Sequence, residues 1–393
     1  MRRAVCHVAM CAVGTTLIAS GAVTIRAAAP PVTVRTVALE ADGVIGVALT
    51  NGTAVHLADV PVTVHTENGT LVAVRWTEVP TRTPVASAVG GTTLAGHGLH
   101  LLVAYVDLAH DEMRVRRSDD GGRTWASPEV LGPRPAGPAL PTACVVPADD
   151  GLRGVVAWSA QPSESDGPLS IAQWTDTGWH LAVHAAVRSS GAAVYCPTHG
   201  SPEIVWRDHR DGTGPRVAVY HAEVDASGGL LRERRVLAPA YDPSLCGYAD
   251  TRFVGYHTGT NDAHLARSLD RGVTFAEVTG AAEGPRGQAL DDTGKFVSVA
   301  CGPHMIVAAW GDWPTKAAAN AKAPSRQLGT VVSTDGGASW LRLRLAGDDT
   351  SQGPATVSVS GDRALVFWKA VGGVRLAVIE RQPFHGEAPR ETP

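Results

Sequence analysis

Residues 118–125 read Ser-Asp-Asp-Gly-Gly-Arg-Thr-Trp, and the chain repeats this pattern twice. The copies are Ser-Leu-Asp-Arg-Gly-Val-Thr-Phe at 268–275 and Ser-Thr-Asp-Gly-Gly-Ala-Ser-Trp at 333–340. All share Ser-x-Asp-x-Gly-x-Thr/Ser before an aromatic residue, and we call these segments the three frames. Their recurrence indicates a repeated structural unit. The shared positions are Ser118, Asp120, Gly122 and Trp125; Ser268, Asp270, Gly272 and Phe275; and Ser333, Asp335, Gly337 and Trp340.

Short apolar runs that end in an aromatic residue recur in phase with the frames. These runs end at Tyr105, Trp158, Trp206, Tyr256, Trp310 and Trp368. Their spacing of about fifty residues is typical of propeller blades, each a small antiparallel sheet. We therefore predict an all-β, six-bladed β-propeller with four-stranded antiparallel blades, and a seven-bladed propeller is the alternative. The clear blades span 99–382.

The end of the repeat carries too few strands for a complete blade. Segment 353–382 shows only three candidate strands, so an N-terminal strand is needed to close the ring. Residues 70–76 are one candidate for that strand. Residues 32–66 would then form either extra N-terminal strands or the seventh blade. We expect 30–393 to form a single propeller domain.

Each frame has the composition of a tight turn between the third and fourth strands of a blade. The Asp carboxylate can accept hydrogen bonds from backbone N–H groups of its own turn, and glycine permits a positive φ. The final aromatic side chain can cover the sheet. We therefore interpret Asp120, Asp270 and Asp335 as structural carboxylates rather than calcium ligands or catalytic groups.

The three frames resemble the Asp box, or bacterial neuraminidase repeat, of sialidases and other secreted propellers. This resemblance implies a propeller whose boxes lie on the face opposite the active site. It also implies a sialidase catalytic set of a tyrosine nucleophile with Glu, an Asp acid/base and three arginines. That set is not matched here, because the early Arg-Ile-Pro motif is missing and residues 355–360 contain no tyrosine.

The N-terminus is typical of a secretory signal peptide, which we assign to residues 1–29. Arg2 and Arg3 precede an apolar run without acidic residues, and small residues follow at 27–29. An uncleaved anchor is the alternative, although we expect a secreted, extracellular protein without stable membrane insertion. Removal of this segment would leave 31 basic against 38 acidic residues, a charge of about −7 that argues against nucleic acid as a partner.

Four cysteines follow the predicted signal peptide: Cys144, Cys196, Cys246 and Cys301. An even number in an exported chain favours disulfides. All four occupy the first strand of successive blades by their phase in the repeat. We predict the pairs Cys144–Cys196 and Cys246–Cys301, and the alternative is four buried thiols.

Three acidic residues each stand two positions after a blade aromatic, where the loop on the face opposite the frames should begin. They are Asp107, Asp208 and Asp312. Carboxylates that converge there could act as an acid and a base in glycoside hydrolysis, and they are the candidate catalytic residues. The alternative is that each Asp simply forms a turn.

Cationic and aromatic residues beside these acids are candidates for ligand binding. Arg207, His209 and Arg210 share one loop, and an arginine fork suits a carboxylate or sulfate on a glycan. The alternative is a salt-bridged turn. Trp313 could stack on a sugar ring. No zinc spacing, phosphate loop or dinucleotide motif is present, so we expect no metal and no cofactor.

These patterns predict a secreted, monomeric propeller that recognises a glycan or another extracellular ligand without the complete sialidase catalytic set. One alternative is a divergent exo-glycosidase, a sialidase-like glycoside hydrolase whose turnover would depend on Asp208 or Asp312. Another is an extracellular platform for protein interactions that binds no glycan.

Overall fold

The computed structural model describes residues 32–40, 54–56, 60–67, 69–134, 141–148, 151–159, 167–175, 177–213, 216–259, 262–278, 295–311, 328–345, 351–370 and 373–382. The predicted signal peptide, residues 1–29, lies outside these ranges, as do Asp312 and Trp313. No helix in the described ranges is long and apolar enough to cross a membrane.

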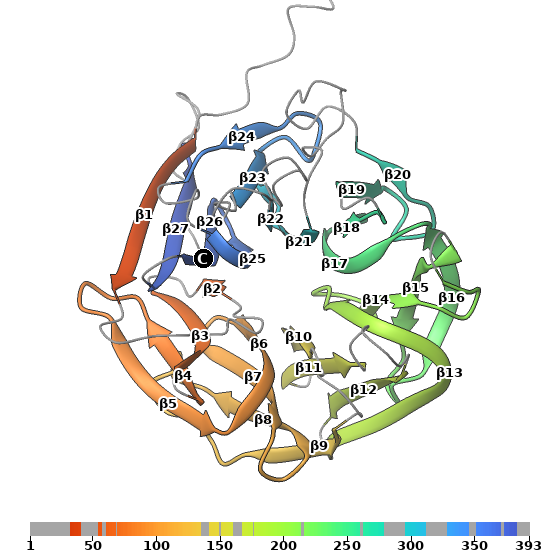
Figure 1. The fold of residues 1–393 in the computed structure, drawn as a ribbon, viewed down its shortest axis with the longest axis horizontal. Helices are drawn as coiled ribbons and strands as arrows, with labels where there is room; N and C mark the ends of the chain where they lie inside the picture. The colour runs from red at the N-terminus through yellow and green to blue at the C-terminus, as the bar shows by residue number, and fades with distance from the viewer. Residues whose placement is uncertain are drawn as a thin grey trace, which may run out of the picture.

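The described strands form antiparallel sheets arranged as a ring around a common centre (Figure 1). Five sheets have four strands each, and one has seven. The first strands of successive sheets contact one another around the centre. The four-stranded sheets are β2 (Ala54–His56), β3 (Pro61–Glu67), β4 (Thr70–Arg75) and β5 (Thr81–Ser87); β6 (Val89–His97), β7 (His100–Asp107), β8 (Glu112–Ser118) and β9 (Glu129–Pro133); β17 (Tyr241–Tyr248), β18 (Thr251–His257), β19 (Ala263–Ser268) and β20 (Ala276–Glu277); β21 (Lys295–Cys301), β22 (Ile306–Gly311), β23 (Leu328–Ser333) and β24 (Leu341–Leu343); and β25 (Ser351–Ser360), β26 (Arg363–Ala370) and β27 (Gly373–Arg381) with β1 (Val32–Glu40).

The seven-stranded sheet contains two blades that share one long strand. It comprises β10 (Thr142–Ala148), β11 (Gly151–Trp158), β12 (Gly167–Thr175), β13 (Gly178–Tyr195), β14 (Glu203–Asp208), β15 (Ala218–Val224) and β16 (Leu230–Leu237). The first part of β13 pairs with β12 and its last part with β14, so β13 is the outer strand of one blade and the inner strand of the next. The antiparallel propeller is therefore confirmed. Its described strands form six hydrogen-bonded sheets. When β13 is counted in both of its blades, these sheets contain seven four-stranded units, which is the number of blades in the alternative prediction.

An N-terminal strand closes the ring, but it is not the segment proposed from the sequence. β1 pairs antiparallel with β27 from Val32 opposite Arg381 to Glu40 opposite Gly373. Residues 70–75 instead form β4, which has neighbours on both sides and four buried residues in succession. A strand buried on both faces is an interior strand, whereas an outer strand can leave residues such as Val34 exposed. The prediction that 70–76 closes the ring was therefore wrong.

The apolar runs that end in an aromatic residue form the second strand of their blades. All six aromatic side chains are buried, with at most 7% of their surface exposed. They pack between neighbouring sheets: Trp158, for example, lies in one cluster with Met113 and Leu131 of the preceding blade. The core of the molecule therefore consists of the layers between blades, which is where these large side chains bury most apolar surface.

Each frame forms the turn between the third and fourth strands of its blade, with the same hydrogen bonds. Ser118 Oγ donates to Asp120 Oδ1 at 2.8 Å and accepts from the Gly122 N–H at 2.8 Å, while Thr124 Oγ1 donates to Asp120 Oδ2 at 2.7 Å. Although burial acts in the opposite direction, the hydrogen bonds from Thr124 and Ser118 lower the pKa of Asp120 to about 2. The same contacts occur around Asp270 and Asp335.

The aromatic residue of each frame packs toward the preceding blade. Phe275 lies 6.2 Å from the ring of His221 on β15, and Trp340 lies edge-on to Phe253 of β18 at 6.3 Å. Trp125 packs on the cluster that contains Val62. We call the end of the ring with the frames and the turns between first and second strands the frame face.

Two disulfides join neighbouring blades through cysteines on, or for Cys196 directly after, their inner strands. Cys144 bonds to Cys196 and Cys246 bonds to Cys301, with Cα–Cα distances of 5.6 and 5.5 Å. Both predicted pairs are therefore formed. Because the partners come from adjacent blades, each bond ties a blade interface near the centre of the ring.

Candidate functional site

The face opposite the frames is marked by irregular first strands. The first strands contain bulges, at which two residues of the strand lie opposite one residue of its neighbour. These bulges lie near the start of β6, β17 and β21 and between Ser189 and Ala192 of β13, where that strand becomes the inner strand of the next blade, and the pairing of β25 is interrupted at the corresponding place. Such bulges re-aim side chains and are common beside functional sites. We call this end of the ring, where the second strands end, the bulge face.

Two bulge residues have strained backbones. Asp242 in β17 has a φ of 46° and Phe296 in β21 has a φ of 56°, although neither is glycine. The left-handed region costs a side-chain-bearing residue about 1–3 kcal/mol and is rare for a bulky one. Phe296 is nevertheless 41% exposed, so its position is not explained by burial of its ring. Strained residues of this kind are common at functional sites, and Asp242 and Phe296 are close to each other on this face.

The carboxylate of Asp242 connects two blades. Its Oδ1 accepts a hydrogen bond from Arg207 Nη1 of β14 at 3.1 Å, and its Oδ2 lies 3.0 Å from His257 Nε2 of β18. The side chain of Asp242 is 23% exposed, whereas Arg207 and His257 are buried. Buried cationic and imidazole groups therefore hold a carboxylate at the surface.

Arg207 is anchored at a second point by Ser190 and His209. Arg207 Nε donates to Ser190 Oγ at 2.6 Å and to His209 Nε2 at 3.0 Å, and Ser190 Oγ lies 2.7 Å from His209 Nε2. All three side chains are buried. The structure thus brings together the predicted ligand-binding candidates Arg207 and His209, with their charged and polar groups held rigidly.

Aromatic rings surround this polar group. Tyr241 stacks on His257 with ring centres 5.3 Å apart, Phe296 lies edge-on to His257 at 6.4 Å, and the Arg207 guanidinium lies 5.2 Å from the Tyr241 ring centre. We call the complete set the bulge-face cluster. It consists of Ser190, Arg207, His209, Tyr241, Asp242, His257 and Phe296. The combination of an anchored carboxylate, a guanidinium and aromatic rings suits a ligand with hydroxyl groups and an apolar ring face.

Asp107 does not belong to this cluster. Its Oδ1 accepts the backbone N–H groups of Ala109 and His110 at 3.0 and 3.1 Å, and Oδ2 lies 2.9 Å from His110 Nδ1 and 3.1 Å from Arg114 Nη1. Burial works against ionisation, but the hydrogen bonds from His110 and Ala109 lower the pKa of Asp107. These contacts are those of a turn-forming residue.

Asp208 is likewise enclosed by its own loop. The side chain is 1% exposed and accepts hydrogen bonds from Trp206 Nε1 at 2.8 Å and from Arg210 N and Nη2 at 2.8 and 2.6 Å. Arg210 also pairs with Glu233 and covers the Tyr220 ring at 4.5 Å. The hydrogen bond to Asp208 raises the pKa of Arg210. The geometry of Asp208 and Arg210 is that of a salt-bridged turn.

Sequence reasoning missed five members of the cluster: Ser190, Tyr241, Asp242, His257 and Phe296. The phase of the first strands could have placed Tyr241 and Phe296 on this face, as it placed the cysteines. The bulges that orient these side chains have no sequence signature comparable to the frames.

A buried ion pair between blades was also missed. Arg252 of β18 donates to both oxygens of Glu203 of β14, at 2.8 and 2.6 Å, and Glu203 Oε2 lies 3.0 Å from His221 Nε2. Arg252 is 1% exposed and Glu203 is 4% exposed. Burial opposes the ionised form, but the hydrogen bonds from His221 and Arg252 lower the pKa of Glu203. No group of three His, Cys, Asp or Glu residues in the described ranges is arranged to hold a metal ion.

No protein-family model matches this chain, and no curated protein matches its sequence. Among solved structures, a protein of unknown function from Dyadobacter fermentans is similar with a TM-score of 0.45 and 14% identity over 75% of this chain and 95% of that one. The fucose-binding, six-bladed lectin of Aleuria aurantia gives a TM-score of 0.47 and 13% identity over 75% and 96%. Trypanosoma rangeli sialidase gives a TM-score of 0.45 and 13% identity over 77% of this chain and 56% of its own. The similarity to these propellers is distant.

Proposed function

We propose that the chain is a secreted Asp-box propeller that binds a glycan through the bulge-face cluster, without the complete sialidase catalytic set. One observation carries this proposal: Asp242, held between Arg207 and His257, lies in a strained bulge beside the exposed ring of Phe296. The repeated hydrogen bonds of the three frames support the Asp-box assignment. The two disulfides are consistent with an extracellular protein.

The chemistry of sugars fits this arrangement. A sugar hydroxyl both donates and accepts, so it can donate to a carboxylate such as that of Asp242, which is 23% exposed. The C–H face of a pyranose is weakly apolar and can cover an aromatic ring such as Phe296. Because the polar groups are already held by one another, little side-chain entropy is lost on binding.

The state of the described carboxylates supports binding without hydrolysis. A typical glycosidase needs two carboxyl groups free to reach the scissile bond from opposite sides. Among the described residues near this face, Asp107 and Asp208 are each enclosed by their own turns, which leaves Asp242 without a matching second carboxylate in the cluster.

A glycan array, followed by titration of the strongest hit, tests this proposal. Asp242→Asn and Phe296→Ala should each weaken that binding by about tenfold or more, because they remove a charge-assisted contact and a stacking surface. Asp120→Asn, on the frame face, is the matched control and should leave binding unchanged. Unchanged affinity in both cluster variants would disprove the site, and release of a cleaved sugar on incubation would identify a hydrolase instead.

A further inference from the structure

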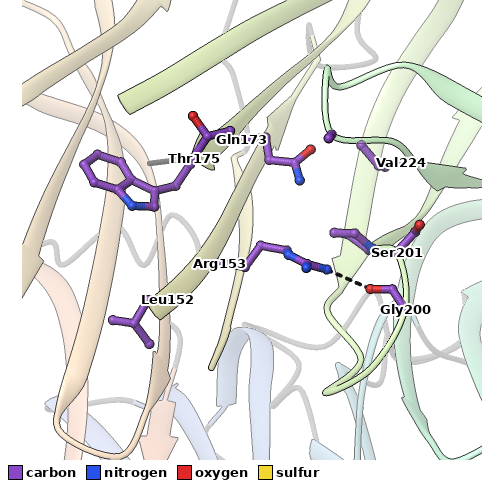
Figure 2. A pocket seen from close by; sticks show the side chains of 10 residues that line it. Leu152, Arg153, Gln173, Thr175, Gly200, Ser201 and Val224 are labelled. Carbon is purple, nitrogen blue, oxygen red and sulfur yellow. Dashed lines mark hydrogen bonds between the residues drawn. The ribbon is translucent and has the colours of Figure 1, made fainter. Parts of the chain in front are cut away.

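The frame face has a cavity of about 550 Å³ between the β10–β13 blade and the β13–β16 blade (Figure 2). One wall is formed by the start of β11 and the end of β12, with Arg153, Gln173 and Thr175. The other wall is the loop before β14, with Gly200 and Ser201, and the turn after β15. This volume is within the range of small-molecule sites. We call it the frame-face groove.

Gln173 leaves an unsatisfied acceptor in the groove. Gln173 is only 5% exposed, and its Oε1 is buried and has no hydrogen-bond partner among the residues that the structure describes. Figure 2 shows the amide extending between the two walls, toward Val224 and Ser201. Buried polar atoms of native proteins are nearly always hydrogen-bonded, so a rotation of this amide that turns Oε1 into the groove would allow a ligand donor to satisfy it.

Arg153 gives the groove a positive charge. Its Nη1 donates to the Gly200 carbonyl at 2.7 Å across the groove, and this is the single hydrogen bond that its side chain makes to the described residues. The other guanidinium N–H groups can therefore serve a ligand. No carboxylate occurs among the described residues that line the groove. An anion is favoured over a cation at this site.

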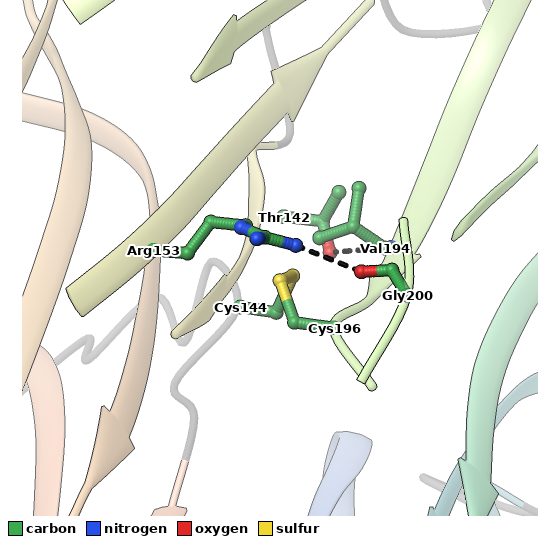
Figure 3. The surroundings of a disulfide bond; sticks show 6 residues. All are labelled: Thr142, Cys144, Arg153, Val194, Cys196 and Gly200. Carbon is green, nitrogen blue, oxygen red and sulfur yellow. Dashed lines mark hydrogen bonds between the residues drawn. A yellow bond between two sulfur atoms is a disulfide. The ribbon is translucent and has the colours of Figure 1, made fainter. Parts of the chain in front are cut away.

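The two walls are tied together below the groove. The Cys144–Cys196 disulfide joins β10 to the strand that enters the loop of Gly200 (Figure 3). Thr142 Oγ1 also accepts from the Val194 N–H at 3.4 Å. The groove is consequently preformed, which reduces the entropy lost when a ligand binds.

We infer that the frame-face groove is a second binding site, distinct from the proposed glycan site, and that its ligand is a sugar acid. The carboxylate of a hexuronate would pair with Arg153, and a ring hydroxyl would donate to Gln173 Oε1. The apolar C–H groups of the ring would contact Pro202 and Val224, which also line the groove.

Calorimetric titration with methyl β-D-glucuronide tests this inference. Methyl β-D-glucoside, which has the same ring without the carboxylate, is the matched ligand and should bind about tenfold more weakly. Arg153→Met should remove this preference. Arg123→Met, on the same face but outside the groove, should retain it.

The variant Gln173→Leu tests whether Gln173 has a role in binding or in stability. Removal of an orphaned acceptor should leave the thermal midpoint unchanged or higher, while the affinity for the glucuronide falls about tenfold. Equal affinity for the two glycosides, or full binding by Arg153→Met, would overturn the inference. Loss of glucuronide binding in Asp242→Asn alone would assign the ligand to the bulge face. Failure of the glycan array test does not affect these outcomes, because they concern residues on the other face.

Discussion

The frame face and the bulge face use carboxylates in opposite ways. Asp120 is satisfied by groups no more than four residues away in its own turn. Asp242 is satisfied by Arg207 and His257, which are 35 and 15 residues away and belong to two different blades. A local arrangement can be copied into several blades, whereas a contact between blades is particular to one interface. The repeated carboxylates therefore stabilise the fold, and the unique one is the better candidate for function.

Positive φ values occur in the backbones of both faces. On the frame face they fall on glycines such as Gly122 and Gly272, which adopt them without steric cost, and also on Arg271 within one frame. On the bulge face they fall on Asp242 and Phe296. The two faces therefore differ in how their carboxylates are held, within one turn or between blades, and not in backbone strain.

The largest expected effect tests whether stability also depends on contacts between blades. Glu203→Leu should lower the free energy of unfolding by about 3–5 kcal/mol, because the guanidinium of Arg252 would remain buried without its partner. Glu223→Leu is the matched control, since its partner Arg232 is 72% exposed, and it should cost less than about 1 kcal/mol. Urea denaturation followed by tryptophan fluorescence measures both. Equal losses would show that burial of the pair is unimportant.

A somewhat smaller effect is expected from the disulfides. Replacing Cys144 and Cys196 together by alanine should lower the free energy of unfolding by about 2–4 kcal/mol and weaken binding in the frame-face groove. The Cys246 and Cys301 double replacement should cost a similar amount of stability but leave the groove intact. Glucuronide binding that survives the first replacement would show that the groove does not need this bond.

Asp208→Asn tests whether Asp208 and Asp242, both on the bulge face, have different roles. Asp208 is locked in its own loop, so this variant should lose about 1–2 kcal/mol of stability through its contacts with Arg210 and Trp206. It should bind the array-identified glycan within about threefold of the parent affinity, a difference below about 1 kcal/mol. Titration beside Asp242→Asn measures this, and a loss as large as that of Asp242→Asn would place Asp208 in the binding site.

The smallest expected change in the free energy of unfolding concerns Asp120 in the first frame, and it depends on pH. The folded-state pKa of Asp120 is about 2, below the value of about 3.9 for an unfolded chain. Its stabilisation is therefore complete at neutral pH and is lost as the pH falls from about 4 toward 2. Asp120→Asn should cost about 1 kcal/mol at pH 7, a modest value because solvent screens the turn. The stabilities of variant and parent should converge near pH 2 in urea titrations; a constant difference would contradict the assignment.

Local patterns explain which parts of this structure were predictable. The positions of the second strands follow from apolar runs such as the one ending at Trp310, and the turns follow from the frames. The disulfide partners follow from the phase of the cysteines in the repeat. Closure by β1 was not predictable, because its alternating Val and Thr residues resemble those of several interior strands. The continuation of β13 from one blade into the next was not predictable from the sequence either.

The sequence by itself determined the propeller class, the frames and the two disulfides, because each depends on residues close together or in a regular phase. Only the tertiary structure decided the seven four-stranded units, the closing strand and the bulge-face cluster. The orphaned acceptor of Gln173 was also visible only there. These features depend on which blades become neighbours and on how bulges turn particular side chains. Such contacts join residues far apart in the chain, and a single sequence carries no local signal for them.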